Sequence, residues 1–459
     1  MTSVADCTAH CKAASAARPE RMARAGRIPR LANRFPSLRF RSLISLIFCA
    51  TLALVFALPV TALAGPRTGA QSASSRTHLS AAELAREAEE ALYSAEFSNA
   101  AVLYERAASL EPDDAYNWLG LANSRLLGIL QASGRLDASL YSASTPLLEK
   151  SWPPPDAAKV RDWWTALERT RALCDERIRK NPADAEAWYI HSAGHGMEAN
   201  YRLTIERKYF DALRAAGRTR DAARKALSLL PRLVDAKLLL GAYEFGIGSI
   251  PAAFRWMLFF GGHSGSKSKG IELLLEARSG GTRARAAAMS LLGVFYFRNE
   301  EFARSREMWL ELQRTYPRNL RADLELARNY AKEGDTIDAA SALTRALQQV
   351  HARRAAAQAH GREYSPATSG IEEDRLLFEL AGLLESVGRR EEALARYEEL
   401  IALPGARGVL AAHAHVLAGD ICRGLGRRER ATQHYQAARA LPFPEAQKLA
   451  AQRMKLLRR

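Results

Sequence analysis

The sequence predicts an all-α array of helical hairpins that stack into a solenoid. A composition rich in Ala, Leu, Arg and Glu favours helices throughout. A spacing of small, aromatic and proline residues also recurs at Ala88, Ala100, Tyr104, Ala107 and Pro112, at Ala381, Ala393, Tyr397, Leu400 and Pro404, and at Gly419, Ala431, Tyr435, Ala438 and Pro442. Small residues let two helices approach closely, the aromatic ring fills the remaining space, and the proline ends the second helix.

These positions resemble the signature of the tetratricopeptide repeat family over most of residues 81–443. The match is specific in the first repeat and in the last two, and weaker between them. The resemblance implies about seven or eight helical hairpins, twisted into a right-handed superhelix whose concave face is built by the first helix of each hairpin. It also implies a protein that binds partners rather than an enzyme.

Residues 1–64 predict a signal peptide or a membrane anchor. They carry nine Lys and Arg against two acidic residues, a net charge of 9 − 2 = +7, and their apolar core spans 43–58. Ala62-Leu-Ala64 then forms a small-residue exit typical of cleavage, which favours a signal peptide over an anchor formed by 43–64. We therefore expect a periplasmic or secreted chain, or alternatively one anchored in the inner membrane. Met22 is a second possible start.

The distribution of the remaining positive charge argues against a nucleic acid partner. Of the total of +16, 16 − 7 = +9 is spread along residues 65–459 without a clustered basic stripe, so we expect no nucleic acid partner. After the leader only Cys174 and Cys422 remain, far apart and without metal-ligand spacing.

The elements follow in order along the chain. The first repeat predicts helices at about 81–94 and 97–110, a long helix follows at 157–180, and the next pair must be lengthened because 192–226 is stretched relative to the first repeat. The resulting division is a flexible tether at 65–80, the main array at 81–350, a linker at 351–370, a C-terminal repeat pair at 371–443 and a capping helix at 444–459.

A second resemblance covers about residues 185–320. Leu240 to Gly248, Pro251, Trp256 and the helix that begins at Gly270 are similar to the central block of a broad group of bacterial exported repeat proteins. That group is distantly similar to the Iml2/TTC39-like repeat group. The resemblance implies helical architecture and scaffolding, and it implies no catalytic residue.

Segment 243–262 is apolar, aromatic and interrupted by glycines. Phe254, Trp256, Phe259 and Phe260 could contact a membrane surface or line an apolar pocket. The alternative, which we favour, is an irregular helix pair buried against the long helices, because aromatic runs occur more often in cores than at surfaces.

His191, His195 and Glu198 share one face of a predicted helix, a spacing that could hold a divalent metal. The order H-x-x-x-H-x-x-E lacks the catalytic H-E-x-x-H arrangement. Polar residues at a helix interface are the preferred interpretation, so we expect no metal, no cofactor and no catalytic residue.

The predicted function is an exported scaffold that binds a protein or peptide in its concave groove, in envelope assembly or transport. Periodicity places Asn117, Asn123, Arg125 and Asn329 on the groove side of their helices, where arginines would select acidic side chains. The alternative is a lipid- or substrate-handling component of an envelope transport system that uses 243–262.

Overall fold

The structure is a computed structural model that describes residues 79–133, 154–250, 258, 262–359, 373–403 and 408–457. Seventeen helices and no strand occur among these residues. The helices are α2 (Ala81–Tyr93), α3 (Phe97–Leu110), α4 (Ala115–Ala132), α5 (Ala157–Lys180), α6 (Ala185–Thr204), α7 (Tyr209–Leu229), α8 (Ala236–Gly248), α10 (Lys267–Gly280), α11 (Arg285–Arg298), α12 (Phe302–Thr315), α13 (Leu320–Glu333), α14 (Thr336–Ala359), α16 (Glu373–Ser386), α17 (Arg390–Ala402), α18 (Val409–Gly424), α19 (Arg428–Ala440) and α20 (Pro444–Leu457).

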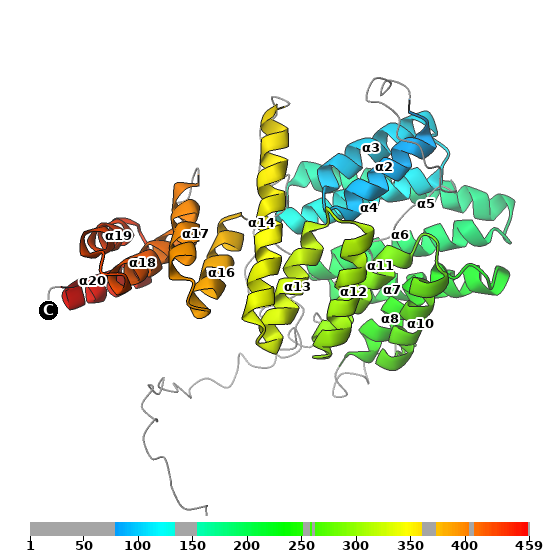
Figure 1. The fold of residues 1–459 in the computed structure, drawn as a ribbon. Coiled ribbons are helices and arrows are strands. Elements are labelled where there is room, and N and C mark those ends of the chain that lie inside the picture. Colours follow the sequence, from blue (N-terminus) through cyan, green and yellow to red (C-terminus); the bar gives the residue numbers. More distant parts are fainter. Residues whose placement is uncertain are drawn as a thin grey trace, which may run out of the picture. The chain divides into compact units, whose positions relative to one another are not determined.

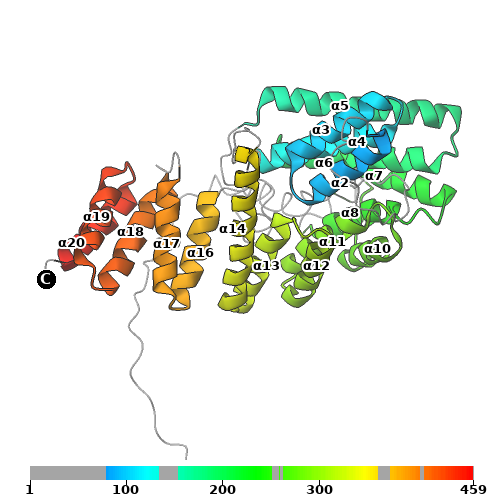
Figure 2. The same cartoon turned by 45° about the horizontal axis from the view of Figure 1, so that its top comes forward.

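The helices pack as consecutive pairs, in the order of the chain (Figures 1 and 2). Within the described ranges there are eight such pairs: α2–α3, α4–α5, α6–α7, α8–α10, α11–α12, α13–α14, α16–α17 and α18–α19, and α20 packs on the last of them. The prediction of an all-α, tetratricopeptide-like solenoid of helical hairpins is therefore confirmed.

The repeat spacing has the packing role that the sequence predicts for it. Gly419 lies so close to the ring of Tyr435 that a Cβ atom there would sit 2.5 Å from Tyr435 Cε1. A Cβ atom on Gly293 would likewise lie 2.6 Å from Trp309 Cε2. The rings of Tyr435 and Trp309 are both fully buried. The two helices of a hairpin can approach this closely only where one of them lacks a side chain.

Six hairpin turns within the described ranges share a positive φ at the same position. In each, the residue two positions before the second helix has a positive φ: Ala95 (59°), Arg207 (57°), Glu300 (64°), Gly334 (83°), Gly388 (80°) and Gly426 (76°). This left-handed region favours glycine, and the three glycines have open space around the missing side chain. The turn therefore repeats along the array even where its sequence does not.

Two predictions about helix length are confirmed. The long helix α5 has the predicted bounds, and the stretched pair α6 and α7 contains helices of 20 and 21 residues, against 13 and 14 in α2 and α3.

First helices in the middle of the array are buried on all sides. Every residue of α8 except Lys237 is buried, and α4, α6 and α11 also bury most of their residues. A helix that is apolar all round lies inside a protein rather than at a surface.

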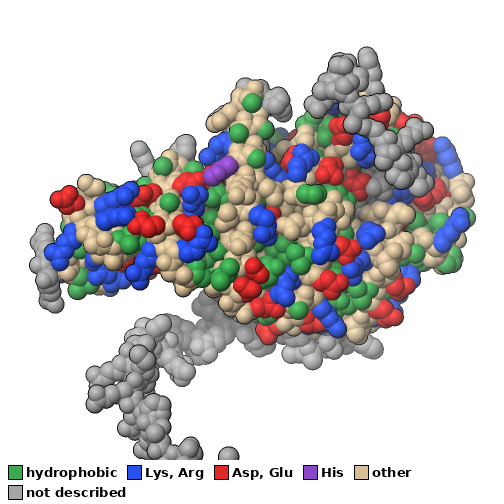
Figure 3. Space-filling view, viewed as in Figure 1, with side chains coloured by type: hydrophobic (Ala, Val, Ile, Leu, Met, Phe, Trp, Pro, Cys, Tyr) green, Lys and Arg blue, Asp and Glu red, His purple; other side chains and the backbone are tan. Residues whose placement is uncertain are grey.

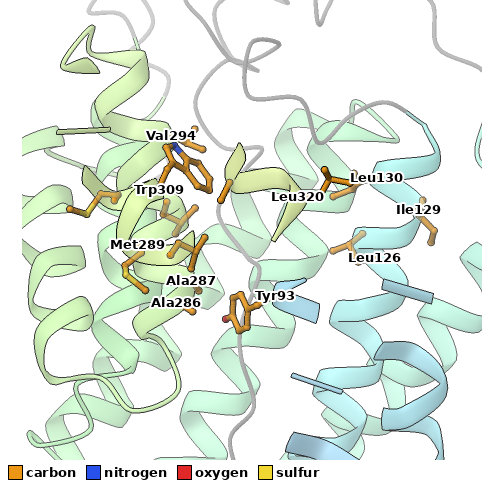
Figure 4. Packing of buried hydrophobic residues seen from close by; sticks show 14 of the residues in the cluster. Tyr93, Leu126, Ile129, Leu130, Ala286, Ala287, Met289, Val294, Trp309 and Leu320 are labelled. Atoms are coloured by element: carbon orange, nitrogen blue, oxygen red, sulfur yellow. The ribbon is translucent and has the colours of Figure 1, made fainter. Parts of the chain in front are cut away.

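Part of this burial comes from contacts between the first hairpin and the later helices, which we call the closure contact. The rings of Tyr93 and Tyr316 stack with centroids 4.8 Å apart, and Arg353 Nη2 donates to Ser94 O at 2.8 Å. Tyr93 belongs to the same buried cluster as Trp309 and Met289 (Figure 4). The first hairpin thus covers helices that an open groove would expose.

The predicted linker needs a correction. Residues 351–359 are not a loop but the last part of α14, because the alanine-rich run from His351 to Ala359 favours helix. The rest of that linker lies outside the described residues, as do the leader at 1–64 and the tether up to residue 78. The terminal helix α20 spans Pro444–Leu457. No helix within the described ranges is long and apolar enough to cross a membrane.

Candidate partner-binding site

The three asparagines predicted to face a groove are buried. Asn117 is 2% exposed, and Asn123 and Asn329 are fully buried. Asn329 Nδ2 donates to Glu325 O of its own helix at 2.7 Å. A partner cannot reach these side chains, so their expected place on an open concave face is wrong. The spacing placed them on the inner side of their helices, but that side is covered in the folded chain.

Arg125 is accessible in part, although its guanidinium already has partners within the array. Its side chain is 21% exposed, and it contacts Glu105 Oε1 at 2.8 Å and Asp162 O at 3.0 Å. Arg125 therefore links α3, α4 and α5, and a partner would have to compete with these contacts.

The four aromatic residues proposed for a membrane contact or an apolar pocket, Phe254, Trp256, Phe259 and Phe260, lie outside the described residues. Two described residues of segment 243–262 belong to the core. Phe245 is fully buried and stacks on Phe295 with ring centroids 3.7 Å apart, and Leu258 is 2% exposed. These two residues agree with the interpretation of a segment packed against the long helices.

Just after this segment, His263 packs on α7. Its ring lies 2.9 Å from where a Cβ of Gly217 would be, and its Nδ1 is 2.9 Å from Tyr243 Oη. Arg220 of α7 donates to Gly262 O at 2.9 Å, which ties the same loop to the long helix.

The His191, His195 and Glu198 group is organised by an arginine. Arg171 of α5 contacts Glu198 Oε2 at 2.7 Å and lies 3.4 Å from His195 Nδ1, while His191 Nε2 turns away to Asp175 at 3.1 Å. Burial, reinforced by His195, lowers the pKa of His191 to about 4. A guanidinium thus sits where the three side chains would have to converge on a metal.

Next to this group, three arginines and two carboxylates line a pocket of about 300 Å³: Glu198, Arg202, Asp211, Arg214 and Arg218. The pocket lies at the end of the α6–α7 hairpin, because its residues come from the last turns of α6 and the first turns of α7. Below we call it the arginine pocket.

Glu198 anchors the arginine pocket. It accepts from Arg171 at 2.7 Å, Arg218 at 3.2 Å and Arg202 at 3.4 Å, and its side chain is 10% exposed. Burial acts against its ionisation, but His195 and the arginines outweigh it and hold the pKa of Glu198 well below its usual range. One carboxylate therefore holds three guanidinium groups that would otherwise repel one another.

The outer arginines keep much of their surface free. The side chain of Arg214 is 76% exposed and that of Arg218 is 53% exposed, although each contacts one carboxylate. Within the pocket three arginines face two carboxylates, while next to it Arg171 adds a positive charge and Glu206, 2.6 Å from Arg202 Nη1, adds a negative one. This arrangement suits a ligand that brings its own carboxylates, since guanidinium groups pair with them in a charge-assisted way.

The arginine pocket was not predicted from the sequence. A signal existed, because Glu198 and Arg202 are four residues apart on α6, as are Arg214 and Arg218 on α7. The same spacing is common on solvated helix faces, so the sequence alone cannot single it out.

No protein-family model matches this chain, and no curated protein matches it. Several solved structures are similar to it. Pseudomonas aeruginosa PilF has a TM-score of 0.34 and 16% identity, covering 59% of this chain and 98% of its own. Yeast Tom70 has a TM-score of 0.30 and 12% identity, covering 82% and 88%. Human IFIT1, as a dimer with PPP-AAAA, has a TM-score of 0.32 and 14% identity, covering 83% and 82%. Similarities of this size carry no argument about function, so the repeat assignment depends on the hairpins and their motif.

Proposed function

We propose that this chain is an exported scaffold of the tetratricopeptide type that binds an acidic segment of a protein or peptide partner, in envelope assembly or transport. The observation that carries this proposal is the arginine pocket, where the exposed side chains of Arg214, paired with Asp211, and Arg218, paired with the buried Glu198, line one cavity. We propose no catalytic role for the chain.

The pocket supports a carboxylate ligand for an electrostatic reason. Glu198 already offsets part of the repulsion among the arginines, so they are held in place before a ligand arrives. Side chains ordered in advance lose less conformational entropy on binding. A peptide carboxylate would add a second partner for Arg214 and Arg218 at the open side of the pocket.

The location of the chain is part of the proposal. The leader at 1–64, with its basic start, apolar core and small-residue exit, supports export, and so does the resemblance to exported bacterial repeat proteins that are distantly similar to the Iml2/TTC39-like group. Fractionation of cells that express the full chain tests this, with the mature protein expected in the periplasm or outside the cell. Retention at the inner membrane would instead favour an anchor formed by 43–64.

A direct binding test uses a labelled oligoglutamate peptide and the full chain, kept in solution with a mild detergent. We expect fluorescence anisotropy to rise with the parent protein at low salt and to fall as salt screens the charges. The double variant Arg214→Glu and Arg218→Glu should weaken binding by about tenfold or more.

The matched control replaces two exposed arginines elsewhere, Arg314→Glu with Arg428→Glu, and changes the net charge by the same amount. If both double variants weaken binding equally, the effect is one of net charge and the arginine pocket is not the site. A labelled oligolysine peptide should not bind any of the proteins.

A pull-down from envelope extract with the same proteins then identifies the natural partner. The proposal requires a protein that the parent and the control variant retain and that the pocket variant loses. Copurified lipid without a protein would favour the alternative, a lipid- or substrate-handling component of an envelope transport system that uses segment 243–262.

A further inference from the structure

Three side chains of metal-ligand type converge where α14 meets the C-terminal repeat pair. They are His351 of α14, Glu373 at the start of α16 and Glu399 of α17, and one ligand atom from each lies within 4.8 Å of the others. His351 Nε2 is 2.9 Å from Glu399 Oε1 and 3.6 Å from Glu373 Oε1. We propose that this triad binds a first-row divalent metal ion such as Zn²⁺.

The two carboxylates are oriented by arginines. Arg396 holds Oε2 of Glu399 at 2.6 Å, and Arg354 pairs with Oε2 of Glu373. In each glutamate one oxygen is therefore bound to a guanidinium while the other, Oε1, faces His351. Outer partners that fix a ligand in this way are typical of metal sites, where they orient the groups that contact the ion.

Glu373 supplies an independent sign that a ligand is expected. This residue is only 4% exposed, and its Oε1 atom has no hydrogen-bond partner among the described residues. A buried carboxylate oxygen without a partner is costly, because it has lost water and gained no donor. A cation placed between Oε1 and His351 would satisfy it.

The spacing of the three atoms fits a small cation. With Zn–N and Zn–O distances of about 2.0–2.2 Å, two ligand atoms of a tetrahedral site lie about 3.4 Å apart. The two separations from His351 Nε2, 2.9 and 3.6 Å, bracket that value, and the two carboxylate oxygens lie within 4.8 Å of each other. An imidazole with two carboxylates favours borderline ions such as Zn²⁺, and water would complete the coordination.

A proton is the competing occupant. A protonated His351 could pair with both glutamates without any metal, and the charges of Arg354 and Arg396 oppose a further cation. The bound metal ion and the ion pair respond differently to the triad variants. Loss of any one ligand weakens metal binding, whereas the ion pair persists as long as the histidine and one carboxylate remain.

The site would connect two parts of the array. His351 belongs to the α13–α14 hairpin, whereas both glutamates belong to α16–α17, and charged side chains with a histidine lie on the surface where these helices meet (Figure 3). Metal binding would therefore stabilise the packing of the C-terminal repeat pair on α14, independently of the arginine pocket.

The test is a Zn²⁺ titration of the full, untagged chain after treatment with a chelator, followed by calorimetry and thermal unfolding. We expect one equivalent of Zn²⁺ to bind and the apparent Tm of the C-terminal transition to rise by about 2–5 °C. His351→Ala and Glu399→Gln should each weaken binding at least tenfold. Arg396→Gln, which removes only an orienting partner, should weaken it by about 10–100-fold.

The matched control is His413→Ala, which removes a histidine of α18 outside the triad and should leave Zn²⁺ binding unchanged. Circular dichroism of each variant without metal separates lost binding from lost folding. The proposal is wrong if the parent chain binds no Zn²⁺ at tenfold excess, or if the triad variants bind it as the parent does.

Discussion

The middle hairpins and the C-terminal repeat pair use the same packing rule in different surroundings. In α11–α12, Trp309 packs on Gly293, and in α18–α19, Tyr435 packs on Gly419 in the same way. Yet α11 buries eleven of its 14 residues, whereas α18 buries eight of 16. The first helix of a hairpin is therefore interior in one region and half exposed in the other, although the local motif is the same.

This difference shows which interactions belong to the hairpin and which belong to its surroundings. Contacts between the two helices of a hairpin recur wherever the motif recurs. In the described part of the C-terminal pair, the main contacts of each helix are with helices one or two places away in the chain. Substituting a motif residue should therefore destabilise only the nearby helices in the C-terminal pair. In the middle block, by which we mean the hairpins around α11–α12 that the closure contact covers, it should destabilise more of the array.

The largest expected effect comes from removing a buried motif ring in each region. Trp309→Ala and Tyr435→Ala should each lower the local unfolding free energy by about 3–5 kcal/mol, because both rings are buried against a glycine. All seven tryptophans precede residue 310, so tryptophan fluorescence in urea does not follow the C-terminal pair, whereas far-UV circular dichroism follows both regions.

We expect Trp309→Ala to lower the fluorescence midpoint and Tyr435→Ala to leave it unchanged while lowering part of the dichroism transition. Equal shifts of both signals with Tyr435→Ala would mean that the two regions unfold as one unit, and the comparison would fail.

A second, smaller effect concerns the closure contact and pH. Glu89 of α2 is 7% exposed and lines a pocket of about 250 Å³ with Arg283 and Tyr316. Burial, with a contribution from Glu90, raises the pKa of Glu89 to about 8. Between about pH 4.5 and 8 the folded chain therefore keeps a proton that the unfolded chain has lost, so stability falls as pH rises through this window.

Glu89→Gln should remove this dependence. We expect the variant to gain about 2–4 kcal/mol over the parent at pH 8.5 and almost nothing at pH 4.5, as measured by the fluorescence midpoint in urea. Glu87→Gln, at an exposed position on the same helix, is the control and should change neither value. A pH-independent gain from Glu89→Gln would contradict the explanation.

The smallest expected effect compares the hairpin turns. Glu300 adopts the same positive φ as Gly388, at 64° and 80°. Glu300→Gly should stabilise the middle block by about 0.5–1 kcal/mol, and Gly388→Ala should destabilise the C-terminal pair by about 1 kcal/mol. Glu300→Ala keeps a Cβ atom and should bring no gain, so a gain equal to that of glycine would point to the lost charge instead. Thermal unfolding by calorimetry measures all three.

Much of the fold could be predicted because it depends on neighbouring segments. The bounds of α5, the lengthened α6 and α7, and the pairing of helices follow from residues less than about two helices apart. The linker was predicted too long because His351 to Ala359 is polar and aperiodic, although its alanines favour helix.

The candidate site could not be predicted in the same way. Periodicity places Asn117 and Asn123 on the inner side of α4, and it contains no information about what covers that side. The arginine pocket depends on Arg171 reaching Glu198 from the preceding hairpin, and the His351 triad depends on three helices meeting. Such side-chain convergence is not encoded in the spacing of any one helix.

The sequence by itself determined that this chain is an all-α repeat array, the bounds of helices such as α5, and which small and aromatic residues hold the clearest repeats together. Those features depend on contacts between neighbours in the chain, which a fixed spacing can specify. Only the tertiary structure decided which helices are covered and which charges meet. The stacking of Tyr93 on Tyr316 and the bond from Arg353 to Ser94 join residues more than 200 positions apart, and no local pattern encodes such a contact.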